Sequence, residues 1–292
     1  MKSGFIAVIG RANAGKSTLV NVLVGEKVAI VSPKPQTTRD RITGILNTPS
    51  MQAAFIDTPG IYRADNLLNS LMQRRAETAA EDVDLVLFVI DAHEGLGERD
   101  KALAKKFATG QVPCVTVLTK TDIMPETLLI SEIKELSEFC TDIVPVSARK
   151  GKNVRELLRV IEARLPEGEP LFPEGIISDR SERFMIAEIM REKILLKFDR
   201  EVPHGVAVRI NGIEDKGGVA NVNLDIICEK ANHKPILIGK RGSAIKEVSQ
   251  MAREDMEKFL GKKVFLTTYV RVEENWRARP ALLKENGYTD EE

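Results

Sequence analysis

Eight residues near the N-terminus, Gly10 to Ser17, have the types and the spacing that bind phosphate groups. They read Gly-Arg-Ala-Asn-Ala-Gly-Lys-Ser and directly follow the apolar run Phe5–Ile9. Glycines let backbone amides turn toward oxygen atoms, and a helix that begins at Lys16 adds the positive end of its dipole. The Lys16 ammonium can reach the terminal phosphates, and the Ser17 hydroxyl can ligate Mg²⁺. A plain glycine turn before a helix is the alternative. The predicted contacts are Gly10, Arg11, Ala12, Asn13, Ala14, Gly15, Lys16, Ser17 and Thr18.

A carboxylate at the end of a later apolar run fits the same chemistry. Asp57 closes the run Ala53–Asp57 and opens the string Asp-Thr-Pro-Gly. From a neighbouring strand end it can hold Mg²⁺ through a water molecule, and the Gly60 amide can face the γ-phosphate. Taken alone, this string would be an ordinary turn after a strand. The predicted contacts are Asp57, Thr58, Pro59, Gly60 and Ile61.

The stretch between these two motifs is polar and broken by prolines, so a helix is excluded there. It reads Pro-Lys-Pro-Gln-Thr-Thr-Arg-Asp over residues 33–40. Thr38 can coordinate Mg²⁺ only while the γ-phosphate is present, so the loop would be ordered in one nucleotide state and released in the other. We therefore predict a switch segment, with metal ligands Ser17, Thr38 and Asp57. A solvated surface loop is the alternative.

Two further strings point to guanine as the base. Thr119-Lys120-Thr121-Asp122 ends an apolar run, and the Asp122 carboxylate can accept hydrogen bonds from guanine N1–H and the 2-amino group, a pair that adenine lacks. The Lys120 stem would lie over the ring. Ser147 and Ala148 follow the next strand, where a backbone amide could reach the guanine O6. Each string is weak alone, but their order and strand-end positions are jointly specific.

The elements that would carry these motifs alternate between short β-branched runs and longer amphipathic segments. This pattern favours an α/β domain with a mainly parallel sheet and covering helices. Gly25 is expected to end the first helix, and Asn153 to cap the last one. The predicted strands are Phe5–Ile9, Arg41–Leu46, Ala53–Asp57, Leu85–Asp91, Pro113–Thr119 and Ile143–Ser147, and the clearest helices are Lys16–Val24 and Val154–Arg164.

Residues 166–178 contain three prolines and two glycines, which favours a linker. We therefore predict a nucleotide-binding domain over residues 1–172 and, after the linker, an α+β domain within residues 173–292. Its expected order is helix Arg183–Phe198, strands Gly205–Ile213 and Val219–Glu229, a broken helix, and strand Val264–Val272.

The broken helix carries a candidate nucleic-acid site. Gly239-Lys240-Arg241-Gly242 is a GxxG string in the α-β-β-α-α-β order of a type II KH domain. In such a loop the backbone approaches the phosphates of a single strand while two cations neutralise them. Taken alone, the string would be a commonplace helix interruption. We predict RNA binding by Gly239, Lys240, Arg241 and Gly242.

Composition limits the class of protein. The 292 residues include 43 Lys or Arg and 43 Asp or Glu, so the formal charge is zero, which argues against a generally basic protein that coats nucleic acid. Residues 230–263 nevertheless hold nine basic side chains against four acidic ones. The three cysteines have no paired spacing, and no apolar run approaches the roughly 18 residues of a membrane span. We expect a cytoplasmic protein, with peripheral contact at the inner face of the membrane left open.

The five nucleotide motifs resemble those of translation-factor-related GTPases, and the chain as a whole is similar to the bacterial Era family. The resemblance covers nearly all 292 residues. It implies hydrolysis of GTP to GDP with Lys16, Thr38, Gly60 and Asn13 at the reaction, and nucleotide control of the appended KH domain. It also implies binding to 16S ribosomal RNA near its 3′ end during assembly of the small (30S) subunit. We expect a monomer.

Two residues depart from the common GTPase pattern, and a third residue, Asn13, suggests a second cation. Thr119 stands where asparagine is usual, so its shorter side chain could fail to reach the base or the phosphate loop. Ile61 stands where Ras-like enzymes carry the water-orienting glutamine, so we expect slow intrinsic turnover. In related GTPases an asparagine at the position of Asn13 helps to hold K⁺ near the phosphates. Two alternatives stay open here: a membrane-associated signalling GTPase whose second domain binds protein or lipid, and a P-loop nucleotide kinase.

Overall fold

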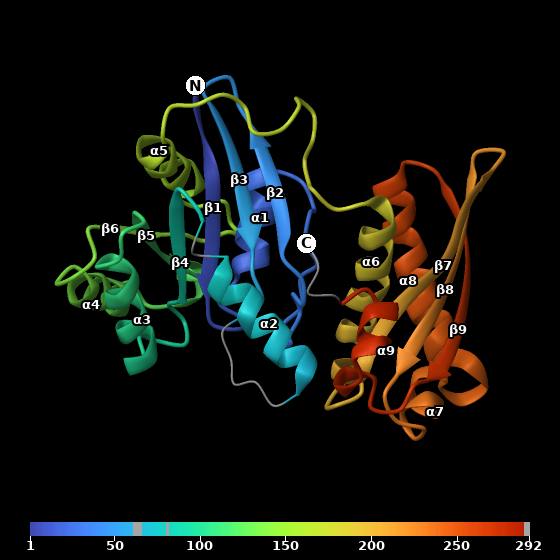
Figure 1. Ribbon diagram of the computed structural model, residues 1–292. Helices are drawn as coiled ribbons and strands as arrows, with labels where there is room; N and C mark the ends of the chain where they lie inside the picture. The colour runs from blue at the N-terminus through green and yellow to red at the C-terminus, as the bar shows by residue number, and fades with distance from the viewer. Residues whose placement is uncertain (61–65, 80–81, 289–292) are drawn as a thin grey trace. The chain divides into compact units, whose positions relative to one another are not determined.

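The computed structural model describes residues 1–60, 66–79 and 82–288. The described chain divides into two compact units (Figure 1). The first comprises residues 1–29, 38–60 and 72–179, and the second comprises residues 30–37, 66–71 and 180–288. Two short stretches of the N-terminal half of the chain, residues 30–37 and 66–71, thus group with the C-terminal part.

The first unit is built on a six-stranded sheet with the strand order β2-β3-β1-β4-β5-β6. All neighbouring strands run parallel except β2, which pairs antiparallel with β3. Strands β3 and β4 are buried along their whole length and mostly apolar, as expected for strands covered on both faces. The strands are β1 (Lys2–Gly10), β2 (Ile42–Asn47), β3 (Met51–Asp57), β4 (Leu85–Asp91), β5 (Cys114–Thr119) and β6 (Asp142–Pro145).

Helices cover both faces of this sheet (Figure 1). On one face, α1 and α5 bury Leu19, Leu23 and Leu157 against the strands, and on the other α3 and α4 bury Ala104 and Leu136. The predicted α/β class is therefore confirmed. The helices are α1 (Lys16–Val24), α2 (Leu67–Thr78), α3 (Glu98–Ala108), α4 (Glu126–Leu136) and α5 (Val154–Arg164), with a 3₁₀ turn η1 at Thr121–Ile123.

Two predicted helix ends have different outcomes. Gly25 ends α1 in a left-handed conformation, and its N–H donates to the carbonyl of Asn21, as predicted. Asn153 precedes α5, but its side chain makes no capping bond, and the predicted cap is wrong in that respect. Its Nδ2 donates instead to the carbonyl of Pro145, at 2.8 Å. The backbone of Asn153 is left-handed, with φ of 61°, in place of the extended conformation typical of a capping residue.

The proline-rich segment 166–178 has no helix or strand, yet it is not detached from the first unit. The backbone N–H of Ile45 donates to Ile177, and the Gln52 Oε1 accepts from the N–H of Phe172, both at 2.9 Å. These bonds satisfy the free edge of β2 and polar groups beside it. The division between the two units falls after Asp179.

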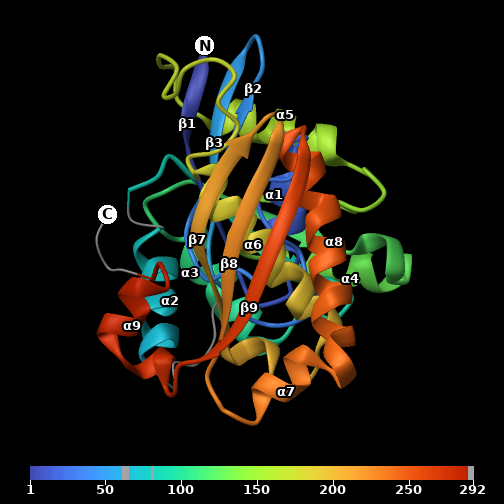
Figure 2. The same cartoon turned by 90° about the vertical axis from the view of Figure 1, so that its right-hand side faces the viewer.

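The second unit places two long helices on one face of a three-stranded sheet (Figure 2). Strand β7 is antiparallel to β8, and β9 is parallel to it. Apolar side chains of α6 and α8, such as Ile189 and Val248, form the core with the strands. The elements are α6 (Glu182–Lys197), η2 (Pro203–Gly205), β7 (Val206–Lys216), β8 (Val219–Cys228), α7 (His233–Ile238), η3 (Lys240–Gly242), α8 (Ser243–Leu260), β9 (Lys263–Val272), η4 (Trp276–Ala278) and α9 (Pro280–Glu285). The predicted α-β-β-α-α-β order is confirmed.

The single tryptophan closes the core of this unit. Trp276 is fully buried, its Nε1 donates to the carbonyl of Gly205, and its ring stacks on Tyr288. It therefore anchors the C-terminal segment and offers no surface to a base. Within residues 1–60, 66–79 and 82–288, no helix is both long and apolar enough to cross a lipid bilayer.

Candidate nucleotide and nucleic-acid sites

The carboxyl ends of the parallel strands bring the predicted nucleotide motifs to one edge of the first unit. The phosphate loop follows β1, Asp57 ends β3, Thr119 ends β5 and Ser147 comes shortly after β6. This edge of a doubly wound sheet is where such folds bind ligands. Residues separated by more than 100 positions in sequence thus face a common space.

Lys16 lies under the phosphate loop, wholly buried. Its Nζ donates to the carbonyls of Gly10 and Arg11, at 3.1 and 2.9 Å. Burial lowers the pKa of its ammonium to about 8, although the nearby Asp57 carboxylate raises it in part. Triphosphate oxygens beside the ammonium would supply negative charge that stabilises its charged form.

This lowered pKa predicts that nucleotide binding depends on pH. Below pH 8 Lys16 is already charged in the free protein, whereas above pH 8 binding must take up a proton, because phosphate favours the ammonium. We expect GTP affinity to fall about fivefold between pH 8 and pH 9, with proton uptake seen by calorimetry in buffers of different ionisation enthalpy. Lys16→Arg, which keeps its charge, is the control for titration of the nucleotide itself. A wild-type affinity that follows the arginine variant would refute the assignment.

The loop after β3 packs directly on the phosphate loop. A Cβ added to Gly60 would lie 2.6 Å from the Cα of Ala12 and 2.7 Å from its nitrogen, a distance that no side chain tolerates. Only glycine allows the two backbones to approach this closely. The backbone of Gly60 therefore lies against the phosphate loop.

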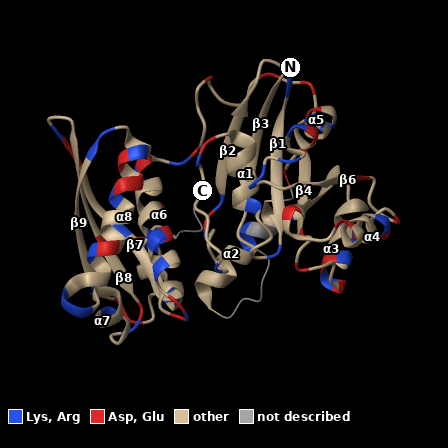
Figure 3. Ribbon diagram, turned by 180° about the vertical axis from the view of Figure 1, so that it is seen from behind, with Lys and Arg blue, Asp and Glu red and all other residues tan. Residues whose placement is uncertain are grey.

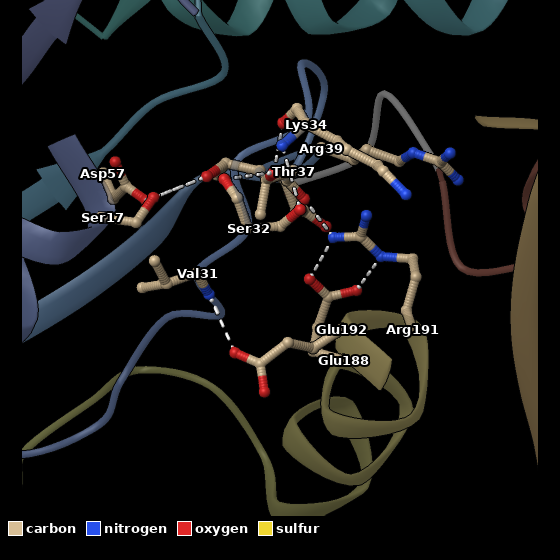
Figure 4. A network of polar contacts seen from close by, with 12 residues as sticks. Ser17, Val31, Ser32, Lys34, Thr37, Arg39, Asp57, Glu188, Arg191 and Glu192 are labelled. Carbon is tan, nitrogen blue, oxygen red and sulfur yellow. Dashed lines mark hydrogen bonds and ion pairs between the residues drawn. The ribbon is translucent and has the colours of Figure 1, made fainter. Parts of the chain in front are cut away.

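The three predicted metal ligands meet at one point. Ser17 Oγ donates to Asp57 Oδ2 at 2.7 Å, Thr38 Oγ1 lies 3.1 Å from the same oxygen, and the two hydroxyls are 2.8 Å apart (Figure 4). The other oxygen, Asp57 Oδ1, is buried and has no hydrogen-bond partner among the described residues. Burial raises the pKa of this carboxyl, and the neighbouring Lys16 opposes the rise.

These oxygens suit a hard cation. Mg²⁺ prefers one or two carboxylates together with water and phosphate oxygens. Among the residues that the structure describes, no group of three or more His, Cys, Asp or Glu side chains could hold a metal ion. A cation at Asp57 would therefore depend on the two hydroxyls and on a bound phosphate, and it would satisfy the orphaned Oδ1.

The residues predicted to bind the guanine base also lie together. Ser147 Oγ donates to Asp122 Oδ1 at 2.6 Å, and this bond lowers the pKa of the carboxyl, which therefore stays ionised and able to accept from a base. Lys120 has a left-handed backbone, and its Nζ pairs with Asp91 at 2.5 Å. Ala148 is partly exposed beside Ser147, and Thr121 begins the 3₁₀ turn that carries Asp122.

Thr119 keeps a bond to the phosphate loop, so the expectation that its shorter side chain fails to reach that loop is wrong. Its Oγ1 donates to the carbonyl of Ala14 at 2.7 Å, and the carbonyl of Ile90 lies 3.0 Å away. The strand end is close enough to the loop for the short hydroxyl to reach. Gly15 lies directly against this side chain, since an added Cβ would be 3.6 Å from Thr119 Oγ1.

Removing this hydroxyl predicts a measurable cost. Thr119→Val leaves the buried Ala14 carbonyl without its donor at nearly the same side-chain volume, and we expect guanine nucleotide affinity to fall about tenfold. Thr119→Ser, which keeps the hydroxyl, should bind nearly as the wild type does. Fluorescence titration with GDP measures both, and equal affinity of the valine variant and the wild type would contradict the predicted link.

Sequence reasoning missed two acidic residues that support the site. Asp91 ends β4 and holds both Lys120 and the backbone N–H of His93, and Asp100 of α3 pairs with Arg11 at 3.0 Å. An acid at the end of an apolar strand is a visible signal for Asp91, whereas no local pattern marks Asp100. Ile61 lies outside the described residues.

The GxxG string forms a tight, exposed loop between α7 and α8. A Cβ on Gly239 would lie 2.6 Å from the Cβ of Ala244, and Arg241 and Gly242 have positive φ angles of 53° and 79°. Lys240 and Arg241 are exposed and form no ion pair with any residue that the structure describes. Beside them Ile236 is 49% exposed. The loop offers two unneutralised cations next to apolar surface.

Four other cations of residues 230–263 are neutralised by acidic neighbours. Basic and acidic positions interleave along α8 (Figure 3), with Arg253 paired to Glu257 and Lys258 to Asp255. At the start of β9, Lys262 pairs with Asp215 and Lys263 with Glu257. The net positive charge of residues 230–263 therefore lies near the GxxG loop more than along α8.

Comparisons with known proteins agree with both halves of the chain. A family model described as 50S ribosome-binding GTPase matches residues 5–120, and a KH domain model matches residues 201–277. The chain is 43% identical over 291 residues to a GTPase Era of Clostridium kluyveri and 45% identical over 291 residues to one of Clostridium botulinum, covering 99% and 98% of each chain.

Two solved structures share the whole fold. Each has a TM-score of 0.95, is 41% identical, and covers 99% of both chains. One is Era in complex with MgGDPNP and nucleotides 1506–1542 of 16S ribosomal RNA, and the other is an Aquifex aeolicus Era variant bound to GDP·AlF4⁻. Matches of this extent cover the GTPase fold, the KH fold and the connection between them. The chain therefore belongs to the GTPase Era family, with a GTPase domain followed by a KH domain.

Proposed function

We propose that the protein hydrolyses GTP and binds 16S ribosomal RNA near its 3′ end as an assembly factor of the small ribosomal subunit. The observation that carries this proposal is the whole-chain likeness to an Era bound to MgGDPNP and to that RNA segment. The family model described as 50S ribosome-binding spans only residues 5–120, without the KH domain. We assign residues 1–172 to the GTPase domain and residues 173–292 to the linker and KH domain.

We assign the roles in the nucleotide site from the contacts described above. Mg²⁺ would be held by Ser17, Thr38 and, through water, Asp57, and would neutralise the β- and γ-phosphate oxygens. Lys16 and the amides of residues 10–17 clamp these phosphates, and the Gly60 amide meets the γ-phosphate. Slow intrinsic turnover is expected, because Ile61 offers no polar group to orient the attacking water.

K⁺ is the second cation that we propose, at Asn13. Its side chain is exposed at the phosphate loop, on a backbone with φ of 64°, and forms no hydrogen bond with the described residues. A monovalent cation there would stabilise charge that develops between the phosphates. We expect GTP turnover to be at least about tenfold faster in potassium than in sodium, with the difference abolished in Asn13→Ala. Equal rates in both salts would remove this role.

Crosslinking to cellular RNA followed by sequencing tests the choice of target. We expect reads concentrated at the 3′ end of 16S ribosomal RNA, in the region that corresponds to the bound segment of the solved complex. Reads from the large-subunit RNA, or reads spread evenly over both, would overturn the small-subunit assignment. Affinity for the same RNA segment should also differ between the GTP-analogue and GDP states.

The proposed place of action is the cytoplasm. Assembly of ribosomal subunits requires access to ribosomal RNA, and the GxxG loop is the exposed cationic surface that would meet it. Peripheral contact with the inner face of the membrane is a separate proposal that the basic residues of 230–263 suggest. Cell fractionation checks it, and recovery of the protein with ribosomal particles alone would exclude it.

A further inference from the structure

A network of buried charges on α6 holds residues 31–37, which belong to the second unit and include the first part of the predicted switch segment 33–40. Arg191 is 1% exposed, and its Nε and Nη2 donate to the two oxygens of Glu188, at 2.6 and 2.5 Å. The same Nη2 also donates to the carbonyl of Thr37 (Figure 4). The paired carboxylate fixes the plane of the guanidinium, so its third bond has a defined direction.

The beginning of the segment is held by the next residue of the helix. Glu192 Oε1 accepts the backbone N–H of Val31 at 2.9 Å, and Lys34 pairs with Asp199 just after α6, also at 2.9 Å. Within the segment, Thr37 Oγ1 donates to the carbonyl of Lys34 at 2.6 Å. Residues 31–37 thus form a short turn whose first amide and last carbonyl are both bound by α6.

The next residue along the chain belongs to the metal site. Thr38 carries the hydroxyl that meets Ser17 and Asp57, and the boundary between the two compact units falls between Thr37 and Thr38. One peptide therefore has its carbonyl bound by Arg191 and its following side chain directed at the proposed magnesium ligands. The Thr37 carbonyl carbon is bonded to the Thr38 nitrogen, so a displacement of residues 31–37 away from α6 would also move the Thr38 backbone and the hydroxyl that it carries.

We propose that Arg191 is a positioning residue for Thr38, so that α6 of the KH half favours the GTP-bound arrangement of the switch segment. This inference rests on the proposed role of Thr38 as a metal ligand in the GTP state. Coupling of this kind is reciprocal: a nucleotide that engages Thr38 strengthens the hold of α6 on the segment by the same factor. In this positioning role, Arg191 contacts neither the nucleotide nor the metal.

The test compares GTP-analogue and GDP affinities in the full chain with Mg²⁺ present. Arg191→Met is expected to weaken GTP-analogue binding about tenfold and to change GDP binding less than about twofold, because Thr38 contributes only when the γ-phosphate is bound. The double variant Arg191→Met/Glu188→Gln removes the unpaired buried carboxylate and should show the same selective loss. Arg183→Met is the matched control, since this arginine of α6 donates to the carbonyl of Ile210 and should leave both affinities unchanged.

A cycle with Thr38→Ala separates this inference from the proposed function. Thr38→Ala alone should lose GTP-analogue affinity selectively, and adding Arg191→Met should cause no further loss, since Arg191 acts through Thr38. If Thr38→Ala has no selective effect, the proposed metal role of Thr38 fails. If Thr38→Ala is selective while the Arg191 variants lose GDP and GTP-analogue affinity equally, or lose neither, the positioning role of Arg191 is wrong.

Discussion

Replacing Lys240 and Arg241 together by aspartate is expected to lower affinity for the 16S 3′-end segment at least about 100-fold at fixed salt. Both side chains are exposed and unpaired among the described residues, so they would meet phosphate oxygens directly. The change removes two charge-assisted hydrogen bonds, each contributing about 1.5–3 kcal/mol, and places two like charges beside the phosphates. The slope of log K against log salt should become shallower by about 0.7 for each phosphate that the protein no longer neutralises.

The control for this prediction carries the same change of charge elsewhere on the KH domain. Lys216→Asp/Lys258→Asp alters two exposed cations, at the end of β7 and on α8, that already pair with acidic neighbours. Filter binding or fluorescence anisotropy with labelled RNA would compare the two double variants. Equal losses would mean that only the net charge matters, and full retention of binding by Lys240→Asp/Arg241→Asp would favour a KH domain that binds protein or lipid.

Asp122→Asn is expected to change the base that the protein selects from guanine to xanthine. The ionised carboxylate can accept from both N1–H and the 2-amino group of guanine, whereas an asparagine amide offers one acceptor and one donor. Xanthine has an oxygen at position 2, which accepts from that donor. We expect GDP affinity to fall at least about 100-fold, because a buried donor of the base is left unpaired, while affinity for xanthosine diphosphate rises above it.

The hydroxyl beside this carboxylate provides the matched control. The Ser147 hydroxyl orients Asp122 and does not itself read the base, so Ser147→Ala should weaken GDP binding by a smaller factor, about tenfold, without any gain for the xanthine nucleotide. Titration of both variants with GDP and xanthosine diphosphate distinguishes base readout from positioning. The assignment of Asp122 to the base would be abandoned if Asp122→Asn bound GDP as tightly as the wild type.

Short-range patterns were enough to predict the class of each domain and most elements. The bounds of α1, β4 and α5 agree with the prediction residue for residue, and the GxxG string lies between two helices as expected. These features depend on apolar periodicity and on glycine, which act over a few neighbouring residues. The predicted capping bond of Asn153 is absent, because this residue has a left-handed backbone and its amide donates to the carbonyl of Pro145 eight residues away, neither of which a local pattern records.

The nucleotide motifs were likewise visible in the sequence as residue types at strand ends. Only the tertiary structure shows that Ser17, Thr38 and Asp57 meet within hydrogen-bonding distance. It also shows that Thr119 reaches the carbonyl of Ala14. A parallel sheet aligns the carboxyl ends of strands that are far apart in sequence, and the separations that result depend on how closely the backbones pack. Gly60 is the example, because its missing side chain lets the loop after β3 touch Ala12.

By itself, then, the sequence determined which residues could bind phosphate, guanine and RNA, because those capacities belong to side-chain chemistry and local backbone conformation. Only the tertiary structure decided which cations stay unpaired and which buried charges meet. Ion pairing along α8 leaves Lys240 and Arg241 available, and the bond from Arg191 to the Thr37 carbonyl joins positions 154 residues apart. Such pairings follow from three-dimensional proximity and the cost of burying an unpaired charge, which sequence spacing does not encode.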